Sequence, residues 1–566
     1  MEAVRRLSRL AVVVLVAVSA LAAVAGAKVE DYVPADALGI IKVQDPVAQY
    51  DKLQSSALVQ RLEDPSFMPE LAAKISDART GIQNFEAQMG VNVHDALSDL
   101  LGREAVLVVL PGNQGVVIVE GRDADSLQKG VDAFLSVQRA VGDLTGETTS
   151  TYKDVTVHRG LVKRGEQYYA VSGNVLAAGQ QLAAVQKVID VVKGGPSLGA
   201  SAAYRSASGM TAKGAPITGY LSGQVLQPLV EKLSAAPAAG QSQPLQRMLR
   251  SRVAEIASAV QYAALSVSGE KGLQVQLTLV YKDGRIPEAL QCSLPEPGSR
   301  LDAMKLAPKT AAAVAARGIN FQAAWDSQVK AVGAYDPALA QTLQTGLDRL
   351  VGMVGGVQSR EEFFAELGSQ VALVVMPAPD QKGLPEAALA LQLRQTTNIP
   401  NALNTFVAMA VMGLQQQGKG VSLDRSEYNG AHLTTVHTEA NGPLGKLSPT
   451  FGVVGDYLVV ATTQDAIHSI VDAARTNPAP AINKPGTPVG VVTISAPQVQ
   501  ALVRQYHDFL VQQSVKNEGK TMEQAQHDTQ ALEQVLSLLQ TVQITSTFEP
   551  GRTNHYLTVE LAGSRP

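Results

Sequence analysis

The stretch FGVVGDYLVVATTQDAIHSIVD, residues Phe451–Asp472, decides the fold that we predict from the sequence. An apolar run is broken by the turn pair Gly455-Asp456, resumes as a second run and then changes to helical spacing, which indicates a β-hairpin followed by a helix. A second copy, YAVSGNVLAAGQQLAAVQKVID, lies at Tyr169–Asp190, where Gly173-Asn174 takes the place of the turn pair. This recurrence predicts an internally duplicated protein.

Other elements recur around the two copies in the same order. In each half a helix, a strand stopped by proline, a second strand and another helix precede the quoted stretch, and a strand, helical segments and a terminal hairpin follow it. The helices that precede and follow the paired strands are Ile82–Leu101 with Asp125–Ala140, and Phe363–Gly368 with Ile399–Leu414. The predicted strands are Leu38–Val43, Ala105–Leu110, Val116–Glu120, Ile217–Leu221, Ala263–Val267 and Leu273–Val280, then Ala311–Ala316, Val371–Met376, Ala387–Leu393, Val489–Ile494, Val542–Phe548 and Tyr556–Leu561.

These patterns predict an α+β fold that is internally duplicated. Each of two similar units is expected to have a largely antiparallel sheet with helices packed mainly on one face. We expect a signal peptide at residues 1–27, a first unit at 28–294, a linker at 295–306 and a second unit at 307–566. The linker begins at the sequence PEPG.

Composition limits the class of protein. A chain of 566 residues is too long for one ordinary core, and 45% hydrophobic with 17% charged residues is typical of globular proteins. The formal net charge is −4. A mildly acidic chain without a basic stripe excludes nucleic acid from the expected partners.

The N-terminus has the pattern of an export signal. Arg5, Arg6 and Arg9 precede the apolar run Leu10–Val24, and the small residues Ala25-Gly26-Ala27 follow it. We expect cleavage after Ala27 and a periplasmic or secreted protein. The alternative is an uncleaved N-terminal anchor, which would be the chain's only contact with a membrane.

Nucleophilic chemistry finds little support. Cys292 is the only cysteine and has no intramolecular disulfide partner, and nothing near it in the sequence supplies the base that a reactive thiol needs. No G-x-S-x-G motif occurs, and we interpret SASG at Ser206–Gly209 as a solvated loop.

Phosphate and metal motifs are equally weak. Gly413–Gly420 resembles a P-loop but has Gly420 where Ser or Thr should bind the metal, and it follows a predicted helix, so we interpret it as a helix terminus. His432 and His437 lie five residues apart on one strand and therefore face opposite sides. The carboxylate pairs Asp123/Asp125 and Glu361/Glu362 stand at helix starts, where the helix dipole favours them. We assign no catalytic, cofactor-binding or metal-binding residue and expect no cofactor.

Two amphipathic segments are the most plausible binding elements. Val499–Leu510 and Met522–Leu539 each carry one apolar stripe at helical spacing. Such stripes ordinarily pack on each other and on a sheet. The alternative is a groove for a partner helix or an acyl chain.

Several short motifs give the chain a family resemblance. They are Y-V-P-A-D at Tyr32–Asp36, L-G-R-E-A at Leu101–Ala105, Y-x-x-V-x-V from Tyr152 and G-N-x-L from Gly173. With the export signal, they resemble an uncharacterised family of exported bacterial proteins described only as a domain of unknown function. The resemblance implies an envelope or secreted location and supplies no catalytic residues.

Three functions remain open at this point. The first is a non-enzymatic envelope protein that binds or organises another envelope component, the second a carrier of a lipid or other apolar ligand, and the third a hydrolase with an unrecognised site. A filled core with an exposed apolar patch would favour the first, an open apolar cavity the second, and convergent polar groups in a cleft the third. The oligomeric state is left open. Differences between the copies, such as His468 against Gln186, mark where a specialised role would lie.

Overall fold

The computed structural model describes residues 28–65, 69–90, 92–163, 165–234, 244–269, 272–291, 294–295, 300–334, 336–353, 357–378, 385–438, 447–478, 482 and 484–562. The predicted signal peptide and Cys292 lie outside these residues. The chain divides into two compact units, one of Met1–Gln227 with Val260–Val280 and one of Pro228–Ala259 with Tyr281–Pro566.

The division differs from the predicted boundaries in two respects. Residues 295–306, predicted as a linker, belong to the second unit, where Leu301, Ala303 and Leu306 are part of the core. Residues 228–259 and 281–294 belong to the second unit, whereas the sequence placed them in the first. The reason is packing: helix α10 (Pro244–Ala259) contacts α11 (Glu288–Gln291) and α12 (Phe321–Gly333). The Arg252 guanidinium also donates a hydrogen bond of 2.7 Å to the carbonyl oxygen of Ser327.

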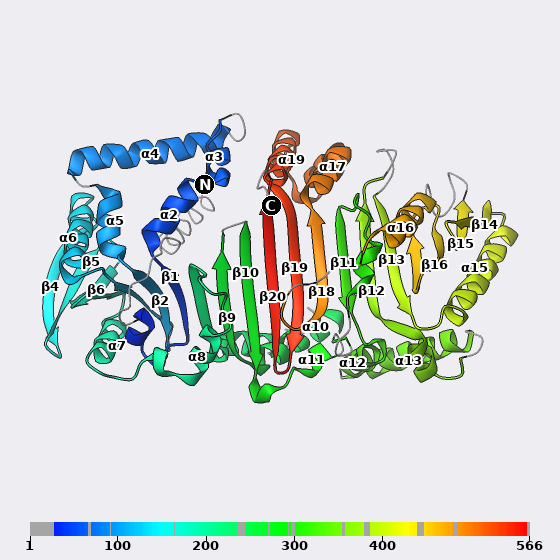
Figure 1. Cartoon of the computed structure of the whole chain (residues 1–566), viewed down its shortest axis with the longest axis horizontal. Coiled ribbons are helices and arrows are strands. Elements are labelled where there is room, and N and C mark those ends of the chain that lie inside the picture. Colours follow the sequence, from blue (N-terminus) through cyan, green and yellow to red (C-terminus); the bar gives the residue numbers. More distant parts are fainter. Residues whose placement is uncertain are drawn as a thin grey trace. The chain divides into compact units, whose positions relative to one another are not determined.

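The first unit is built on one antiparallel sheet (Figure 1). Neighbouring strands follow the order β4-β5-β6-β7-β3-β2-β1-β8-β9-β10. Their bounds are β1 Gly39–Gln44, β2 Glu104–Leu110, β3 Gln114–Glu120, β4 Leu144–Tyr152, β5 Val155–Val162, β6 Gly165–Ser172, β7 Val175–Gly179, β8 Ile217–Ser222, β9 Val260–Ser268 and β10 Leu273–Tyr281.

The second unit has its own antiparallel sheet, with the order β14-β15-β16-β17-β13-β12-β11-β18-β19-β20. Its strands are β11 Ala313–Gly318, β12 Leu367–Met376, β13 Glu386–Leu393, β14 Val421–Tyr428, β15 Ala431–Thr438, β16 Thr450–Val454, β17 Tyr457–Ala461, β18 Thr487–Ser495, β19 Leu539–Glu549 and β20 Arg552–Leu561. The two strand orders agree position by position. The α+β class is confirmed, and the duplication of the sequence stays a prediction.

The predicted turn pairs join strands as expected. Gly173 and Gly455 have φ of 61° and 62° between β6 and β7 and between β16 and β17, the sign that a type II′ turn requires at its first central residue. Only glycine adopts this conformation without steric cost. Phe451–Asp472 and Tyr169–Asp190 therefore each begin with a hairpin, which is followed by a helix.

The helices of the first unit are α2 Pro46–Gln54, α3 Ala57–Leu62, α4 Pro69–Met89, α5 Val93–Leu101, α6 Ala124–Ala140, α7 Leu182–Val192 and α8 Ala202–Ser208, with 3-10 turns η1 Val29–Tyr32, η2 Leu198–Ala200 and η3 Gly223–Leu226. The predicted single helix Ile82–Leu101 is wrong. It is divided between α4 and α5, because Gly90 adopts φ of 62° and the Asn92 side chain caps α5 by accepting from the Asp95 amide at 3.0 Å.

Further helices are α9 Gln227–Ser234, α13 Pro337–Met353, α14 Arg360–Glu366, α15 Asn398–Gln416, α16 Gln464–Thr476, α17 Ala496–Gln505, α18 His507–Glu518 and α19 Met522–Ser537, with η4 Lys282–Gly284 and η5 Asp302–Leu306. The predicted helix Val499–Leu510 is wrong as one element, since α17 ends at Gln505 and α18 begins at His507. The Thr463 hydroxyl caps α16 by accepting from the Ala466 amide at 3.1 Å, whereas the neighbouring Thr462 hydroxyl accepts from the Ala387 amide.

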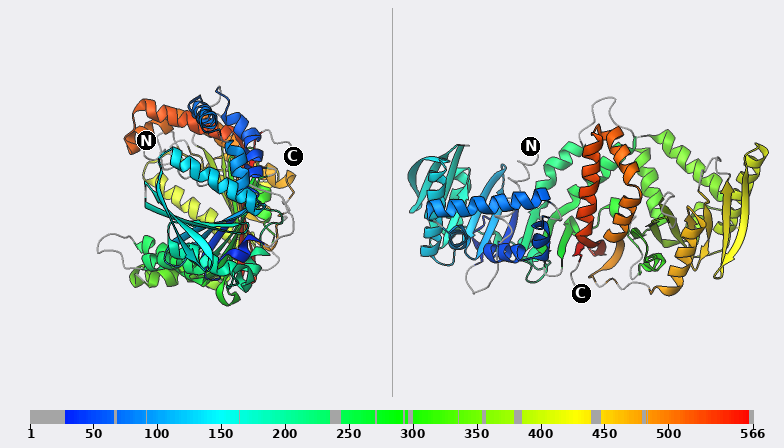
Figure 2. Two further views of the ribbon diagram at one scale, coloured as in Figure 1. Left: turned by 90° about the vertical axis from the view of Figure 1, so that its left-hand side faces the viewer. Right: turned by 90° about the horizontal axis from the view of Figure 1, so that it is seen from above.

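In each unit, helices pack on both faces of part of the sheet. In β17, Val459 packs with Ile467 and Ile470 of α16, whereas its neighbour Leu458 packs with Leu403 of α15. Successive residues of a strand point to opposite faces, so α16 and α15 lie on opposite faces of the sheet. Figure 2 shows helices on both sides of these strands. We call the α16 side the core face and the α15 side the open face.

The first unit follows the same plan. Ile118 of β3 packs with Val185 and Ile189 of α7 on its core face, and Val119 packs with Leu127 of α6 on its open face. None of the helices that the structure describes combines the length and the hydrophobicity required to cross a bilayer.

Candidate functional site

A row of apolar side chains crosses the open face of the second sheet. Paired residues of neighbouring strands place its members side by side, in the order Val460, Leu389, Leu373, Ala315, Val492, Ile544 and Leu557. The five large members from Val460 to Ile544 expose 36–48% of their surface. We call this set the second-unit row.

A corresponding row crosses the open face of the first sheet. Its members are Val117, Leu107, Ile41, Gly219 and Leu265, on strands β3, β2, β1, β8 and β9. These strands hold the same places in the order as β13, β12, β11, β18 and β19 of the second unit. Ile41, Leu107 and Val117 are 37–42% exposed. We call this set the first-unit row.

The alternation of β19 and β20 is opposite to that of an ordinary half-buried strand. Their open face carries the apolar residues Val542, Ile544, Leu557 and Val559 together with Ser546, Thr553 and His555, and their core face carries Gln543, Thr545, Thr547, Asn554, Tyr556 and Thr558. Thr545 and Thr547 are almost fully buried, and the Thr547 hydroxyl donates to the carbonyl oxygen of Pro485 at 2.6 Å. Antiparallel sheets normally turn their apolar side toward the core. Here the polar threonines are buried, whereas Ile544 on the other face is 43% exposed.

Helices frame the second-unit row at both ends of its strands. The chain enters β12 from α14 and leaves β11 into α12, whereas it leaves β18 into α17 and enters β19 from α19. Figure 1 shows α17 and α19 at one end of these strands and α12 and α13 at the other. The exposed row lies between the two groups.

His555 stands on the open face of β20, directly opposite Ser546. Its Nδ1 lies 3.0 Å from the Ser546 hydroxyl oxygen. Burial lowers the pKa of His555 below its usual value, because the charged imidazolium would lose solvation there. The imidazole is therefore neutral at neutral pH.

The histidines weighed as metal ligands do not converge. Within the described residues no group of three His, Cys, Asp or Glu side chains is placed to hold a metal ion. His432 and His437 both lie on β15 and are exposed. His468 stacks on Tyr428 with ring centroids 3.8 Å apart, and Nδ1 of His158 lies 3.0 Å from the Glu147 carboxylate.

The serine and glycine motifs are structural. Ser206 lies on α8, so the predicted loop at Ser206–Gly209 is wrong, and its hydroxyl accepts from the Tyr262 hydroxyl at 2.8 Å. Gly413–Gly420 covers the end of α15, as predicted, with Gly418 at φ of 74° just beyond it. Asp123 and Ser359 cap α6 and α14, which places the predicted carboxylate pairs at helix starts.

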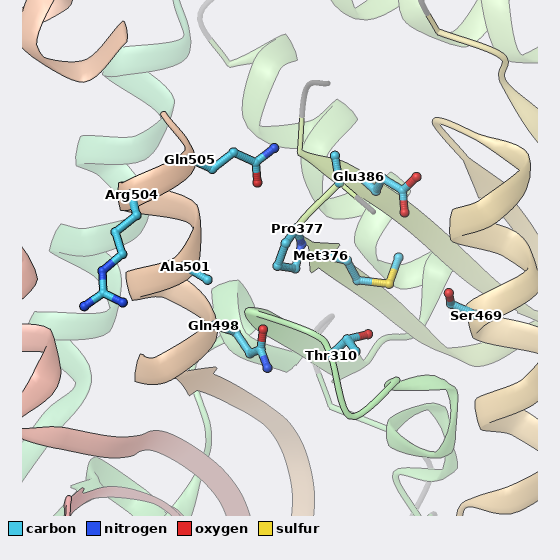
Figure 3. Close-up of a pocket in the computed structure, with 10 residues that line it drawn as sticks. Thr310, Met376, Pro377, Glu386, Ser469, Gln498, Ala501, Arg504 and Gln505 are labelled. Atoms are coloured by element: carbon cyan, nitrogen blue, oxygen red, sulfur yellow. The ribbon is translucent and has the colours of Figure 1, made fainter. Parts of the chain in front are cut away.

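A pocket of about 670 Å³ lies between α17, α16 and the adjoining ends of β12 and β13 (Figure 3). No described residue that lines it is histidine or cysteine. The Glu386 carboxylate accepts a hydrogen bond of 2.6 Å from the Thr463 hydroxyl, and the Arg504 side chain turns away from Glu386 to pair with Glu533 at 3.0 Å. The polar groups do not form a nucleophile and base pair.

The helix pair noted in the sequence packs together. Contacts join α17 to α19 and α18 to α19, and the Gln500 amide donates to the carbonyl oxygen of Glu533 at 3.0 Å. Leu532 and Val535 of the predicted α19 stripe nevertheless remain 46% and 43% exposed. The stripe is therefore only partly buried within the chain.

Sequence reasoning missed the two rows. Leu107 and Leu373 lie in the near-continuous apolar runs Ala105–Leu110 and Val371–Met376, which are typical of strands buried on both faces. The available signal was in the terminal hairpins. The stretch TVQITSTF, residues 541–548, alternates apolar and polar residues, so one face must be apolar.

Fold and surface together define the class: an α+β protein built on two antiparallel sheets of equal strand order, each with an apolar row on its open face. Residues 58–413 match a family described as proteins of unknown function (DUF3352). Because the match spans more than half of the 566 residues, the chain belongs to this family, which confirms the predicted resemblance to a domain of unknown function. No curated protein matches the chain.

Proposed function

We propose that the chain is a non-enzymatic, exported envelope protein that binds another envelope component on the open faces of its sheets. The observation that carries the proposal is that each unit has its own row of apolar residues on its open face, with exposed members at Val117, Leu107 and Ile41 in the first unit and from Val460 to Ile544 in the second. Scattered exposed apolar residues need no explanation, but a contiguous set marks an interaction surface. Two such sets on corresponding strands are not scatter.

The energetics support binding. Covering apolar surface contributes about 25 cal/mol per Å², so a row of large aliphatic side chains offers several kcal/mol to whatever covers it. The cores of both units are already filled, since Ile118, Leu433 and Ile470 are fully buried. The row therefore does not compensate for a missing interior.

The two other hypotheses have weaker support. A carrier encloses its apolar ligand, whereas the rows are open and the pockets at α17, α15 and η1 are lined by polar and charged side chains among others. A hydrolase needs a nucleophile beside a base, and the pocket at Glu386 offers no such pair. Export is part of the proposal and rests on the basic, apolar and small-residue pattern of residues 1–27.

Carbene labelling with peptide mass spectrometry tests the proposal. The full chain is labelled once in purified form and once in the envelope of cells that produce it. Leu373, Leu389 and Ile544 are expected to label in purified protein and to be protected at least threefold in the envelope. Leu161, 41% exposed and outside both rows, is the matched control and should label equally in both. Equal labelling of the rows in both preparations would overturn the proposal.

A further inference from the structure

The second-unit row has the dimensions and the neighbouring charge of a docking surface for an α-helix. Resting on the function proposed above, we propose that its occupant is an amphipathic helix of a partner protein, laid across the strands, with an acidic residue on one flank. The inference depends on the length of the row, its width, the charge beside it and the helices that frame it.

The length of the row corresponds to a helix of about five turns. The row runs over seven strands from Val460 to Leu557. Neighbouring strands are about 4.8 Å apart, so the row is about 29 Å long. At 1.5 Å per residue, a helix of about 19 residues spans that length.

The width also fits one helix. Two residues to either side of Leu373, Val371 and Val375 point to the same face and are half-buried, as are Ala387 and Leu391 beside Leu389. Four residues of strand cover about 13 Å, and an α-helix with its side chains is 10–12 Å wide. A single acyl chain would leave much of this width exposed to water. An amphipathic helix covers it and presents its own polar face to solvent.

One cation stands beside the row. Arg317 of β11 lies two residues from Ala315 on the same face, opposite Val371 and Gly490. It is exposed, and no described side chain forms an ion pair with it. A carboxylate on the flank of the bound helix would complement this charge and fix the direction of the helix. In the first unit, Val43 lies two residues from Ile41, at the position that corresponds to Arg317. Its side chain is apolar and buried, so the first-unit row has no matching cation there.

The framing helices argue against a second copy of the chain as occupant. Stacked sheets pack about 10 Å apart. Helices α14 and α15 stand on the same face, where Phe364 and Leu403 pack on Leu393, and a helix is itself at least 10 Å thick. They would hold a second open face away from the row.

Peptide binding to the purified mature chain tests the inference. The probe is a synthetic 20-residue helical peptide with leucine on one face, lysine and glutamine on the other and glutamate on one flank, followed by fluorescence anisotropy. Leu373→Asp with Leu389→Asp is expected to weaken binding at least tenfold, because both charges would be buried beneath the peptide. Phe509→Asp on α18, outside the row, is the matched control and should leave affinity within twofold.

Reversing the charge at Arg317 tests the direction in which the helix binds. Arg317→Glu is expected to weaken the glutamate-flanked peptide about threefold to tenfold and to strengthen the same peptide with lysine on that flank. A peptide of equal composition with proline at its centre should not bind, since proline breaks the helix.

Three results would overturn the inference without touching the proposed function, which carbene labelling tests separately. They are binding of the proline peptide as tight as that of the helical one, row-dependent binding of palmitate with no peptide binding, and a dimer in sedimentation that Leu373→Asp dissolves. The last two would identify the occupant as an acyl chain or a second copy. Unchanged peptide affinity in the double variant would also overturn it.

Discussion

Helices α6 and α15 occupy corresponding places in the two units but present opposite surfaces. Each follows the second strand of its central hairpin and packs on the open face of its sheet, α6 at Val119 and α15 at Leu393. The exposed side of α6 carries Lys129, Asp132 and Arg139. Helix α15 has no charged residue from Asn398 to Gln416 and exposes its apolar side chains instead.

The exposed residues of α15 are large. Phe406, Met409 and Met412 are 51–54% exposed, whereas Phe134 is the one large apolar side chain exposed on the described α6, at 47%. Methionine adapts to differently shaped partners because its side chain is flexible and polarizable. The difference is that the second unit exposes apolar side chains on α15 and has Arg317 beside its row, whereas the first unit has charged side chains on α6 and buried Val43 in the place of Arg317. The specialised surface lies in the second unit.

The largest effect is predicted for the buried core face of each sheet. Ile189→Ala on α7 and Ile470→Ala on α16 should each lower the free energy of unfolding by about 2–5 kcal/mol, because both side chains are buried against the core face. Leu373→Ala on the open face should cost about 1 kcal/mol or less. Denaturant unfolding of the full chain measures all three.

A loss in the free energy of unfolding from either core variant as small as that from Leu373→Ala would contradict this prediction. In that case the two core faces would not be equivalent supports, and the shared strand order would not imply shared packing.

The next prediction concerns the exposed apolar side chains of α15. Phe406→Lys with Met409→Lys should reduce binding of a fluorescent apolar dye to the native chain by about half, because two exposed apolar side chains become charged. Phe134→Lys on α6 is the matched control and should change dye binding little. The free energy of unfolding should change by about 0.5 kcal/mol or less in every variant, since the positions are exposed. An equal loss from Phe134→Lys would show that the two helices do not differ in this way.

A smaller effect is expected from a contact that both units share. The Tyr152 hydroxyl donates to the Asp190 carboxylate at 3.0 Å, and the Tyr428 hydroxyl donates to Asp472 at the same distance. Tyr→Phe at either position should lower the stability of the chain slightly and to a similar extent, since one hydrogen bond to a charged but solvent-accessible acceptor is lost. Chemical denaturation measures both losses. A clear loss of stability in one variant and none in the other would mean that the neighbouring Lys153 or Asn429 changes the role of the carboxylate.

The smallest effect is a pH dependence confined to the second unit. Burial holds the pKa of folded His555 below the value of about 6.5 in an unfolded chain. The unfolded chain therefore takes up more protons as the pH falls below about 6.5, and stability declines from there through the lower folded pKa. His555→Gln should make the stability of the chain flatter between pH 7 and 5 in denaturant titrations. A decline of the same size in His555→Gln would assign it to other groups.

The strands and hairpins were largely predictable, because they follow from local alternation and turn residues. The errors came where a local signal was overridden. Ile82–Leu101 keeps a helical pattern across Gly90, and only the capping geometry at Asn92 divides it. Thr462 and Thr463 are equivalent as helix caps in sequence, and the pairing of Thr462 with Ala387 decides between them.

The sequence by itself determined the order of strand, turn, strand and helix in each half, because alternation, glycine turns and helical spacing act over a few residues. Only the tertiary structure decided that β3 lies beside β7 and β13 beside β17, and which face of these strands is covered. Runs such as Val371–Met376 are apolar on both faces, so their sequence cannot distinguish the buried Val374 from the exposed Leu373. That distinction depends on where α15 and α16 pack, which is a long-range property of the fold.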